Sequence, residues 1–223
     1  MSRATPEEAR RPAAIAEQAR EGAPSASGLA KAMGAGRARP RAREALDFYP
    51  TADASAARGL IRDEGARLAA FPALWEAAVG AGDIARALAA AGFRVIGSDV
   101  EDRGWRRTRR LDFLAAEAPL APALVTNPPF ALVNARAGAP WIVRAQALFS
   151  AGLRYMALLL SWSWPAAAGL GPLWRGFAPA RVRLMTWRVD WTGEGSPTMA
   201  TAWFVWDGFT PEGETRFLRM ERP

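Results

Sequence analysis

The tetrapeptide Asn127-Pro128-Pro129-Phe130 contains the residues whose types and spacing best suit a chemical reaction. Two prolines restrict the backbone, so the side-chain oxygen of Asn127 and the carbonyl oxygen of Pro128 can point the same way. Both oxygens accept hydrogen bonds from an amino group, which favours attack of its lone pair on a methyl-sulfonium carbon. Phe130 can stack on a base extruded from a duplex. The alternative is a proline-stiffened loop with a core phenylalanine.

The absence of two residue types narrows this chemistry. The chain has no Cys and no His, which excludes cysteine nucleophiles, histidine general bases and Cys/His zinc sites. Cytosine C5 methylation, which uses a cysteine nucleophile, is excluded with them. We therefore expect no metal, and catalysis that relies on carboxylates, amides, backbone groups and aromatic faces.

A glycine-containing turn follows the first predicted strand. Glu76 ends this strand, and Gly80 and Gly82 precede a predicted helix. Glycines let the backbone turn tightly and approach a ligand closely. Asp99 lies at the carboxyl end of the next predicted strand, where an acidic side chain can accept hydrogen bonds from ribose hydroxyls. Together these residues predict a site for a nucleoside-containing cofactor.

Two other interpretations of this turn stay open. Gly80, Gly82 and Ala85 also satisfy the G-x-G-x-x-A dinucleotide pattern, so NAD is a competing cofactor. Against NAD, the carboxylate of Glu76 would repel a pyrophosphate but suits a cationic methionine group, and the chain has no catalytic His or Cys. An ordinary strand-to-helix turn is the second alternative.

From residue 47 onward, apolar runs alternate with helical patterns, which predicts an α/β fold with a parallel sheet and crossover helices. The predicted strands are 73–76, 93–98, 111–114, 123–126 and 154–160, and the predicted helices are 83–91 and 141–151. Segments 182–187 and 198–206 predict a closing antiparallel hairpin, with turn residues at 193–195.

The sequence divides into a flexible basic N-terminal arm, residues 1–45, and a single domain, residues 46–223. A net charge of +7 and a pI of about 11.1 favour a nucleic-acid partner, although a GC-rich coding sequence would also enrich arginine. The basic loop 103–110 could bind backbone phosphates or be a solvated connection. The Trp-rich segment 161–180 could form a lid beside the base pocket or pack under a loop. We see no membrane span and no secretory signal, which predicts a cytoplasmic location.

These residues resemble the class I methyltransferases that modify adenine N6, especially the small enzymes of phages and prophages. The matching segments are 47–51, 75–82, 98–99, 102–104, 112–114, 126–130 and 202–206. The resemblance implies a Rossmann-like, doubly wound, mostly parallel sheet of seven strands with an antiparallel C-terminal hairpin. It also implies S-adenosylmethionine as cofactor, the N6 amine of adenine as acceptor and DNA as partner.

Site roles carried over by the resemblance fall into two groups. The catalytic residues are Asn127, Pro128, Pro129 and Phe130, and the cofactor-binding residues are Tyr49, Pro50, Thr51, Glu76, Gly80, Gly82, Asp99, Asp112 and Phe113. Tyr49 and Phe113 could instead be aromatic residues of the hydrophobic core. Ala77 and Ala52 replace prolines that are usual in the family. The missing prolines and the basic arm leave a catalytically silent nucleic-acid-binding module of the same fold as one alternative. RNA and a protein glutamine are the alternative acceptors, because related enzymes use Asn-Pro-Pro followed by Tyr or Phe on such amines and amides.

Overall fold

The computed structural model describes residues 53–223, apart from residues 106, 191–198 and 209–213 and the side chain of residue 168. Tyr49, Pro50, Thr51, the predicted basic arm and the predicted turn at 193–195 lie outside the described residues. None of the helices among the described residues is long and apolar enough to cross a membrane.

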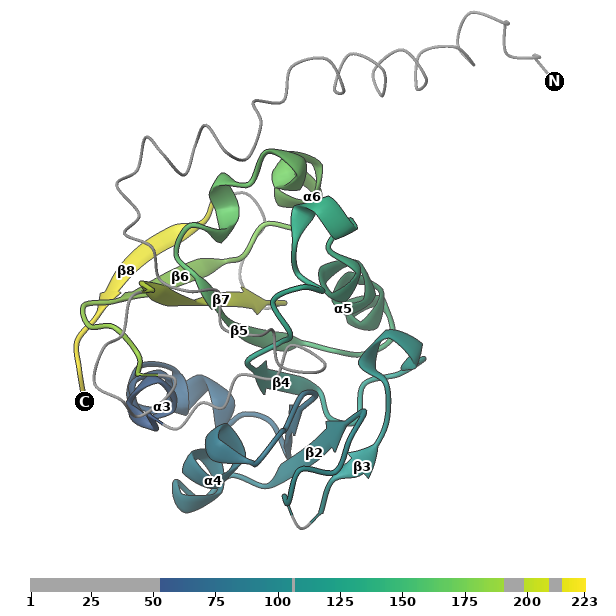
Figure 1. The fold of residues 1–223 in the computed structure, drawn as a ribbon. Helices are drawn as coiled ribbons and strands as arrows, with labels where there is room; N and C mark the ends of the chain where they lie inside the picture. The colour runs from purple at the N-terminus through teal and green to yellow at the C-terminus, as the bar shows by residue number, and fades with distance from the viewer. Residues whose placement is uncertain (1–52, 106, 191–198, 209–213) are drawn as a thin grey trace, which may run out of the picture. The chain divides into compact units, whose positions relative to one another are not determined.

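Helices and strands alternate through most of the described chain (Figure 1). The helices are α3 (Ser55–Leu68), α4 (Asp83–Ala90), α5 (Pro140–Ser150) and α6 (Gly171–Gly176), with short 3-10 turns η2 (Phe113–Ala115), η3 (Ala135–Ala137), η4 (Trp164–Ala166) and η5 (Ala168–Leu170). The strands are β1 (Leu74–Glu76), β2 (Val95–Asp99), β3 (Arg109–Arg110), β4 (Ala123–Thr126), β5 (Tyr155–Ser161), β6 (Arg181–Met185), β7 (Thr201–Asp207) and β8 (Arg216–Met220).

The strands form one sheet in the order β3-β2-β1-β4-β5-β7-β6-β8. The first five are parallel to one another, and β7 runs antiparallel to both β5 and β6. This arrangement confirms the predicted doubly wound, mostly parallel sheet with an antiparallel C-terminal hairpin. The sheet has eight strands and not seven, because β8 adds to the outer edge parallel to β6.

The two faces of the sheet carry separate cores. Figure 1 shows α3 and α4 on one side of the sheet and α5 and α6 on the other. On the α3 and α4 side, buried residues include Leu60, Ile84 and Trp203, and on the other side they include Trp75 and Trp141. Strands covered on both faces need apolar side chains in both directions, which explains the nearly continuous apolar runs of β4, β5 and β7.

The predicted third strand, 111–114, is wrong. The strand in this position is β3, Arg109–Arg110, which pairs with the end of β2. Asp112 Oδ1 accepts a hydrogen bond from the backbone N–H of Leu114 at 2.9 Å, so the chain turns into η2. A short acidic side chain that caps the next turn competes with extension of the strand.

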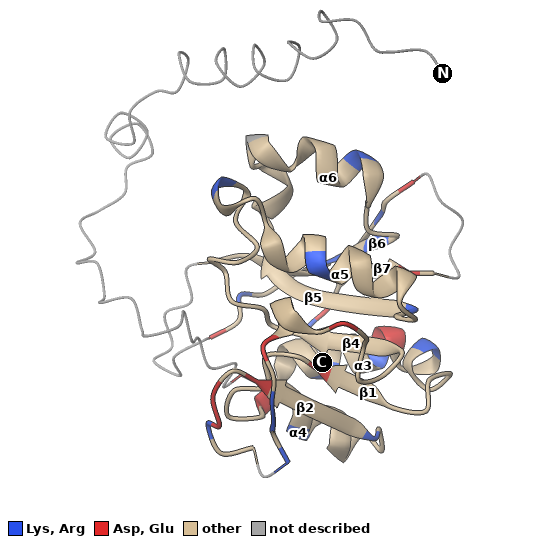
Figure 2. Cartoon of the chain, turned by 90° about the vertical axis from the view of Figure 1, so that its right-hand side faces the viewer, with Lys and Arg blue, Asp and Glu red and all other residues tan. Residues whose placement is uncertain are grey.

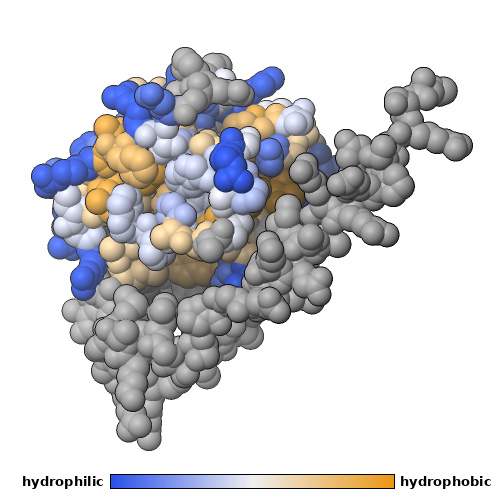
Figure 3. All heavy atoms as spheres, turned by 90° about the horizontal axis from the view of Figure 1, so that it is seen from above, coloured by the Kyte–Doolittle hydropathy of each residue, from blue (hydrophilic) through white to orange (hydrophobic). Residues whose placement is uncertain are grey.

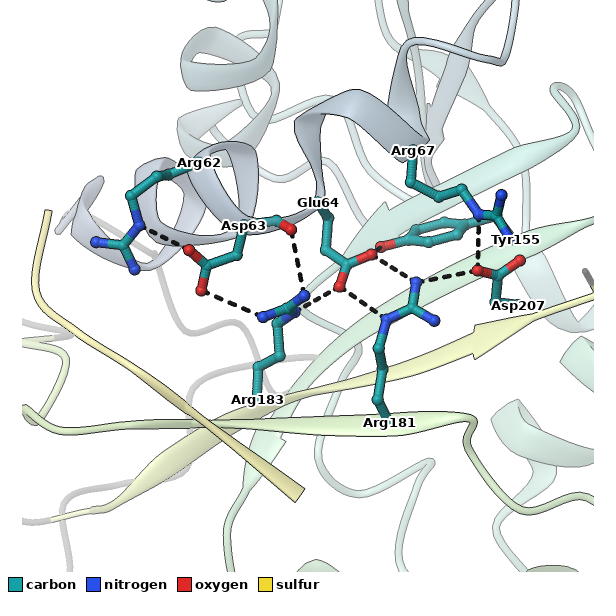
Figure 4. Close-up of polar contacts among 8 residues, drawn as sticks. All are labelled: Arg62, Asp63, Glu64, Arg67, Tyr155, Arg181, Arg183 and Asp207. Carbon is teal, nitrogen blue, oxygen red and sulfur yellow. Dashed lines mark hydrogen bonds and ion pairs between the residues drawn. The ribbon is translucent and has the colours of Figure 1, made fainter. Parts of the chain in front are cut away.

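A buried ionic cluster holds α3 against the sheet (Figure 4). The guanidinium of Arg181 donates to both carboxylate oxygens of Glu64, at 2.8 and 2.6 Å, and to Asp207 at 3.0 Å. Arg67 on α3 donates to the same oxygen of Asp207 at 2.8 Å, and the hydroxyl of Tyr155 donates to Glu64 at 3.4 Å. These contacts join the C-terminal half of α3 to β5, β6 and β7.

The pKa of Glu64 reflects two opposing effects. Burial acts to raise the pKa, but the ion pairs and hydrogen bonds with Arg181 and Arg183 outweigh it, so the pKa lies below its ordinary value. Glu64 therefore remains charged in the folded protein, although its residue is only 3% exposed.

Candidate active site

The carboxyl ends of the neighbouring strands β1, β2 and β4 meet at one edge of the sheet, where ligands bind in open α/β folds. Glu76 ends β1, Asp99 ends β2, and Thr126 ends β4. The parallel register sets Glu76 beside Gly97, and Trp75 beside Leu124 of β4. The sheet thus brings the predicted cofactor half of the site next to the 127–130 loop.

Asp99 ties the glycine turn to the end of β2. Its Oδ2 accepts a hydrogen bond from the backbone N–H of Gly80 at 2.9 Å, and its Oδ1 accepts one from Glu101 at 3.2 Å. Gly80 has φ of 49° and Gly82 has φ of 87°, a left-handed region that favours glycine. Asp99 is 9% exposed, and each carboxylate oxygen has a further lone pair that a ribose hydroxyl could use.

Glu76 is a buried carboxylate without a complete set of partners. Its residue is 2% exposed, and its Oε2 has no hydrogen-bond partner among the described residues. Burial raises the pKa of Glu76 well above its ordinary range, nearby Asp83 and Asp99 raise it further, and a hydrogen bond from the backbone of Ala85 opposes them. A cationic group beside Glu76 would reverse this penalty, because it favours the charged carboxylate.

Acidic positions gather around this edge. Figure 2 shows them in red near β2 and α4, next to the blue basic positions of the segment that leads to β3. Asp83 opens α4 and forms an ion pair with Arg86, while Glu101 forms an ion pair with Arg103 at 3.0 Å. Acidic side chains at this edge are therefore partly paired with arginines of the same segments.

Trp105 packs directly against the cofactor loop. A Cβ on Gly82 would lie 2.9 Å from Cδ2 of the Trp105 ring, and a Cβ on Gly97 would lie 2.8 Å from Cδ1. The indole nitrogen is buried and has no hydrogen-bond partner among the described residues. Gly82 was expected to leave room for a ligand, but its open side is filled by this indole. The only sequence signal for Trp105 is a single aromatic residue in a basic loop.

Asp112 and Phe113 lie in different surroundings. Asp112 is exposed and caps η2, two residues beyond the end of β3. Phe113 is 3% exposed, and its ring stacks on Trp141 with centroids 3.5 Å apart and contacts Trp75 at 5.4 Å. The ring of Phe113 therefore packs in the core, the alternative that the sequence left open, and its contact with a cofactor stays a prediction.

The 127–130 loop leaves β4 at the same edge. Pro128 is buried, whereas Asn127, Pro129 and Phe130 are half-buried. Oδ1 of Asn127 is enclosed by protein atoms, and the carbonyl of Pro129 accepts a hydrogen bond from Leu132 at 3.0 Å. Phe130 packs against the core on the α5 side, so a stacking role for its ring stays a prediction.

Thr126 and Trp164 flank this loop. Oγ1 of Thr126 is buried and has no hydrogen-bond partner among the described residues, directly before Asn127. The indole N–H of Trp164 donates to the carbonyl of Val133 at 2.9 Å, and Trp164 packs against Phe204 and Trp206. Trp164, in the Trp-rich segment 161–180, therefore packs against the core, as the simpler of the two expectations had it.

Sequence comparisons identify no family: no family profile matches the chain, and no curated protein sequence matches it. Comparison with solved structures does find similar folds. A candidate RNA methyltransferase from Pyrococcus horikoshii superposes with a TM-score of 0.57 at 14% identity, covering 81% of this chain and 96% of the other. The chain has the class I methyltransferase fold.

A second solved structure agrees with this fold. It is a protein from Listeria monocytogenes named as a candidate class I S-adenosylmethionine-dependent methyltransferase, with a TM-score of 0.54 and 11% identity. The superposition covers 87% of this chain and 70% of that one. At such low identity the likeness extends to the order of strands and helices, and the class I methyltransferase fold is what the two structures share with this chain.

Proposed function

We propose that this chain transfers a methyl group from S-adenosylmethionine to the N6 amine of adenine in DNA. The observation that carries the proposal is the buried carboxylate of Glu76, with Oε2 lacking a partner among the described residues, next to the strand end that holds Asn127. This arrangement can hold a cationic nucleoside cofactor beside an amine-binding loop.

The residues at the edge fit such a cofactor. Glu76 would pair with the methionine ammonium, and Asp99, held in place by Gly80, would accept hydrogen bonds from the ribose hydroxyls. Asp112 is exposed beyond the next strand and would border the adenine. When bound, S-adenosylmethionine supplies an electrophilic methyl group. The contacts of Tyr49, Pro50 and Thr51 with the methionine end remain part of the proposal.

Asn127 and Pro128 would act on the substrate amine. Their oxygens would accept its two N–H groups and direct the nitrogen lone pair toward the methyl carbon, while Phe130 stacks on the base. An amine nitrogen can lose its extra proton to water after transfer, so no histidine base is required. In this proposal the chain accelerates transfer by holding the amine with its lone pair directed at the methyl carbon.

The charge of the chain favours a nucleic-acid acceptor. A net charge of +7 supports a polyanion, because Lys and Arg near phosphates release counterions. RNA is the second acceptor to test, since the Pyrococcus horikoshii structure is named as a candidate RNA methyltransferase. A protein glutamine and a silent nucleic-acid-binding module are the remaining alternatives.

Calorimetry followed by radiolabel transfer tests the proposal. We expect the purified chain to bind S-adenosylmethionine and not NAD, and to move labelled methyl groups to DNA in preference to RNA or protein. Base-resolution mapping of N6-methyladenine in DNA would then give the target sequence. No binding at millimolar S-adenosylmethionine would favour the silent module, and transfer to RNA or protein alone would replace the acceptor.

A further inference from the structure

Two aromatic side chains far apart in the sequence are exposed and touch each other. Trp162 is 38% exposed and Phe217 is 58% exposed, and their rings meet edge to face with centroids 6.0 Å apart at 85°. Among the described residues, the other large apolar side chains with comparable exposure are valines, Val100 and Val143. An exposed pair of aromatic rings marks a surface that could bind a partner.

Trp162 lies just beyond the end of β5, the strand next to β4, whereas Phe217 lies on the edge strand β8. Thr126, the last residue of β4, pairs with Leu158 of β5, and β5 continues three residues further to Ser161. Trp162 follows directly, and its backbone N–H donates to the carbonyl of Ala200 at 2.9 Å. Trp162 therefore leaves the sheet at the same edge as Asn127, one strand away.

The edge strand β8 adds positive charge to this surface. Alternate residues of a strand share a face, so Phe217 and Arg219 point to one side of β8, whereas Met220 is buried on the other side near Gly59 of α3. The side chain of Arg219 is 75% exposed, and its ion pair with Glu221 is also largely in water. Such an exposed pair adds little energy, so Arg219 can turn to another anion.

An aromatic cleft continues from Phe217. Its volume is about 840 Å³, and its lining includes Trp174, Phe177 and Arg175 together with the acidic residues Asp207 and Glu214. Figure 3 looks down on the molecule from the α6 side and shows orange apolar groups lying between blue hydrophilic ones. The exposed rings of Trp162 and Phe217 and the exposed guanidinium of Arg219 are a combination that binds unpaired nucleotides, by stacking on bases and by pairing with phosphates.

We propose that Trp162, Phe217 and Arg219 form a binding surface for the unpaired nucleotides that flank the target base. The inference rests on the proposed function, since it deepens the account of how the same site holds its nucleic acid. One flanking base would stack on the Trp162–Phe217 pair, and Arg219 would contact a neighbouring phosphate. The surface would hold the strand while Asn127 engages the amine.

Fluorescence anisotropy with a labelled 12-nucleotide single-stranded DNA tests this surface at fixed salt. We expect Trp162→Ala and Phe217→Ala each to raise the Kd for the oligonucleotide about tenfold, the effect of losing one stacked base. Trp162→Phe should stay within about twofold of the original chain, because a phenyl ring still stacks. Arg219→Gln should lower the slope of log Kd against log salt by about one.

Val143→Ala is the matched control, because Val143 is 50% exposed on α5. All variants should keep the far-ultraviolet dichroism and the S-adenosylmethionine Kd of the original chain. The inference is overturned if Trp162→Ala and Phe217→Ala bind the oligonucleotide like Val143→Ala, or if the original chain binds no oligonucleotide. If Trp162→Ala and Phe217→Ala lose oligonucleotide binding but the original chain transfers no methyl group, the binding surface is supported. Only the proposed methyltransferase function is then contradicted.

Discussion

The indole of Trp105 lies against the Cα of Gly97 so closely that a Cβ there would stand 2.8 Å from Cδ1 and 2.9 Å from Nε1. Gly97 belongs to β2 and has no left-handed φ, so the close approach itself requires the glycine. The loop after β2 is thereby joined to the cofactor loop, because the same ring also covers Gly82.

A double-mutant cycle tests this contact. Gly97→Ala should lower the free energy of unfolding by about 1–3 kcal/mol, because the added methyl group overpacks the indole. Combining it with Trp105→Leu should cost less than the sum of the two single changes, by about 1 kcal/mol. Urea unfolding measures all three variants. Gly176→Ala is the control, since a Cβ there meets nothing within 4 Å. Strict additivity would show that the ring does not press on Gly97.

Replacing Glu76 should separate stability from cofactor binding. Its folded-state pKa is raised, so the charged form opposes folding, and this cost grows as the pH rises above the ordinary value of 4.5. Glu76→Gln should therefore raise Tm by a few degrees at pH 8 and have a smaller effect near pH 5. The same variant should bind S-adenosylmethionine at least tenfold more weakly by calorimetry.

The exposed Glu117→Gln variant is the control for both measurements of Glu76. A lower Tm for Glu76→Gln at pH 8, or unchanged cofactor affinity, would contradict the assignment of Glu76 as the partner of a cation.

Replacing Glu64, in the ionic cluster beneath α3, should lower stability, whereas replacing Glu76 should raise it. Glu64→Gln should lower the free energy of unfolding by about 3 kcal/mol near pH 7, because it leaves Arg181 and Arg183 partly uncompensated. Since the folded pKa of Glu64 is lowered, its stabilising contribution is present above 4.5 and is lost as the pH falls below it. Urea unfolding from pH 7 to pH 3 checks this. A loss that is the same at every pH would exclude the ion pairs as its source.

The sequence alone predicts those strands and helices whose pattern of apolar residues matches their burial in the structure. β1, β4 and α5 lie within one residue of the predicted bounds, and Glu76 and Asp99 end their strands as expected. These elements are buried or amphipathic in a regular way, so composition and spacing are enough to find them.

Other elements depend on partners far away in the sequence. The helix α3 was not predicted, because Glu64 is buried only through arginines 117 and 119 residues away. The edge strand β8 has one fully buried side chain, Met220, and β3 exists only through its pairing with β2. Trp105 packs against Gly97, and Phe113 stacks on Trp141. No local sequence pattern connects the residues of either pair.

In the proposed reaction, Asn127 orients a nucleic-acid amine for methylation. The most direct measurement compares methyl transfer to DNA by Asn127→Ala with that by Asn134→Ala, a matched change at an exposed residue whose side chain caps η3. We predict that Asn127→Ala loses at least a hundredfold in transfer rate while its S-adenosylmethionine Kd changes less than twofold, and that Asn134→Ala retains transfer. Undiminished transfer by Asn127→Ala with cofactor binding intact would contradict the role of Asn127 in orienting the amine.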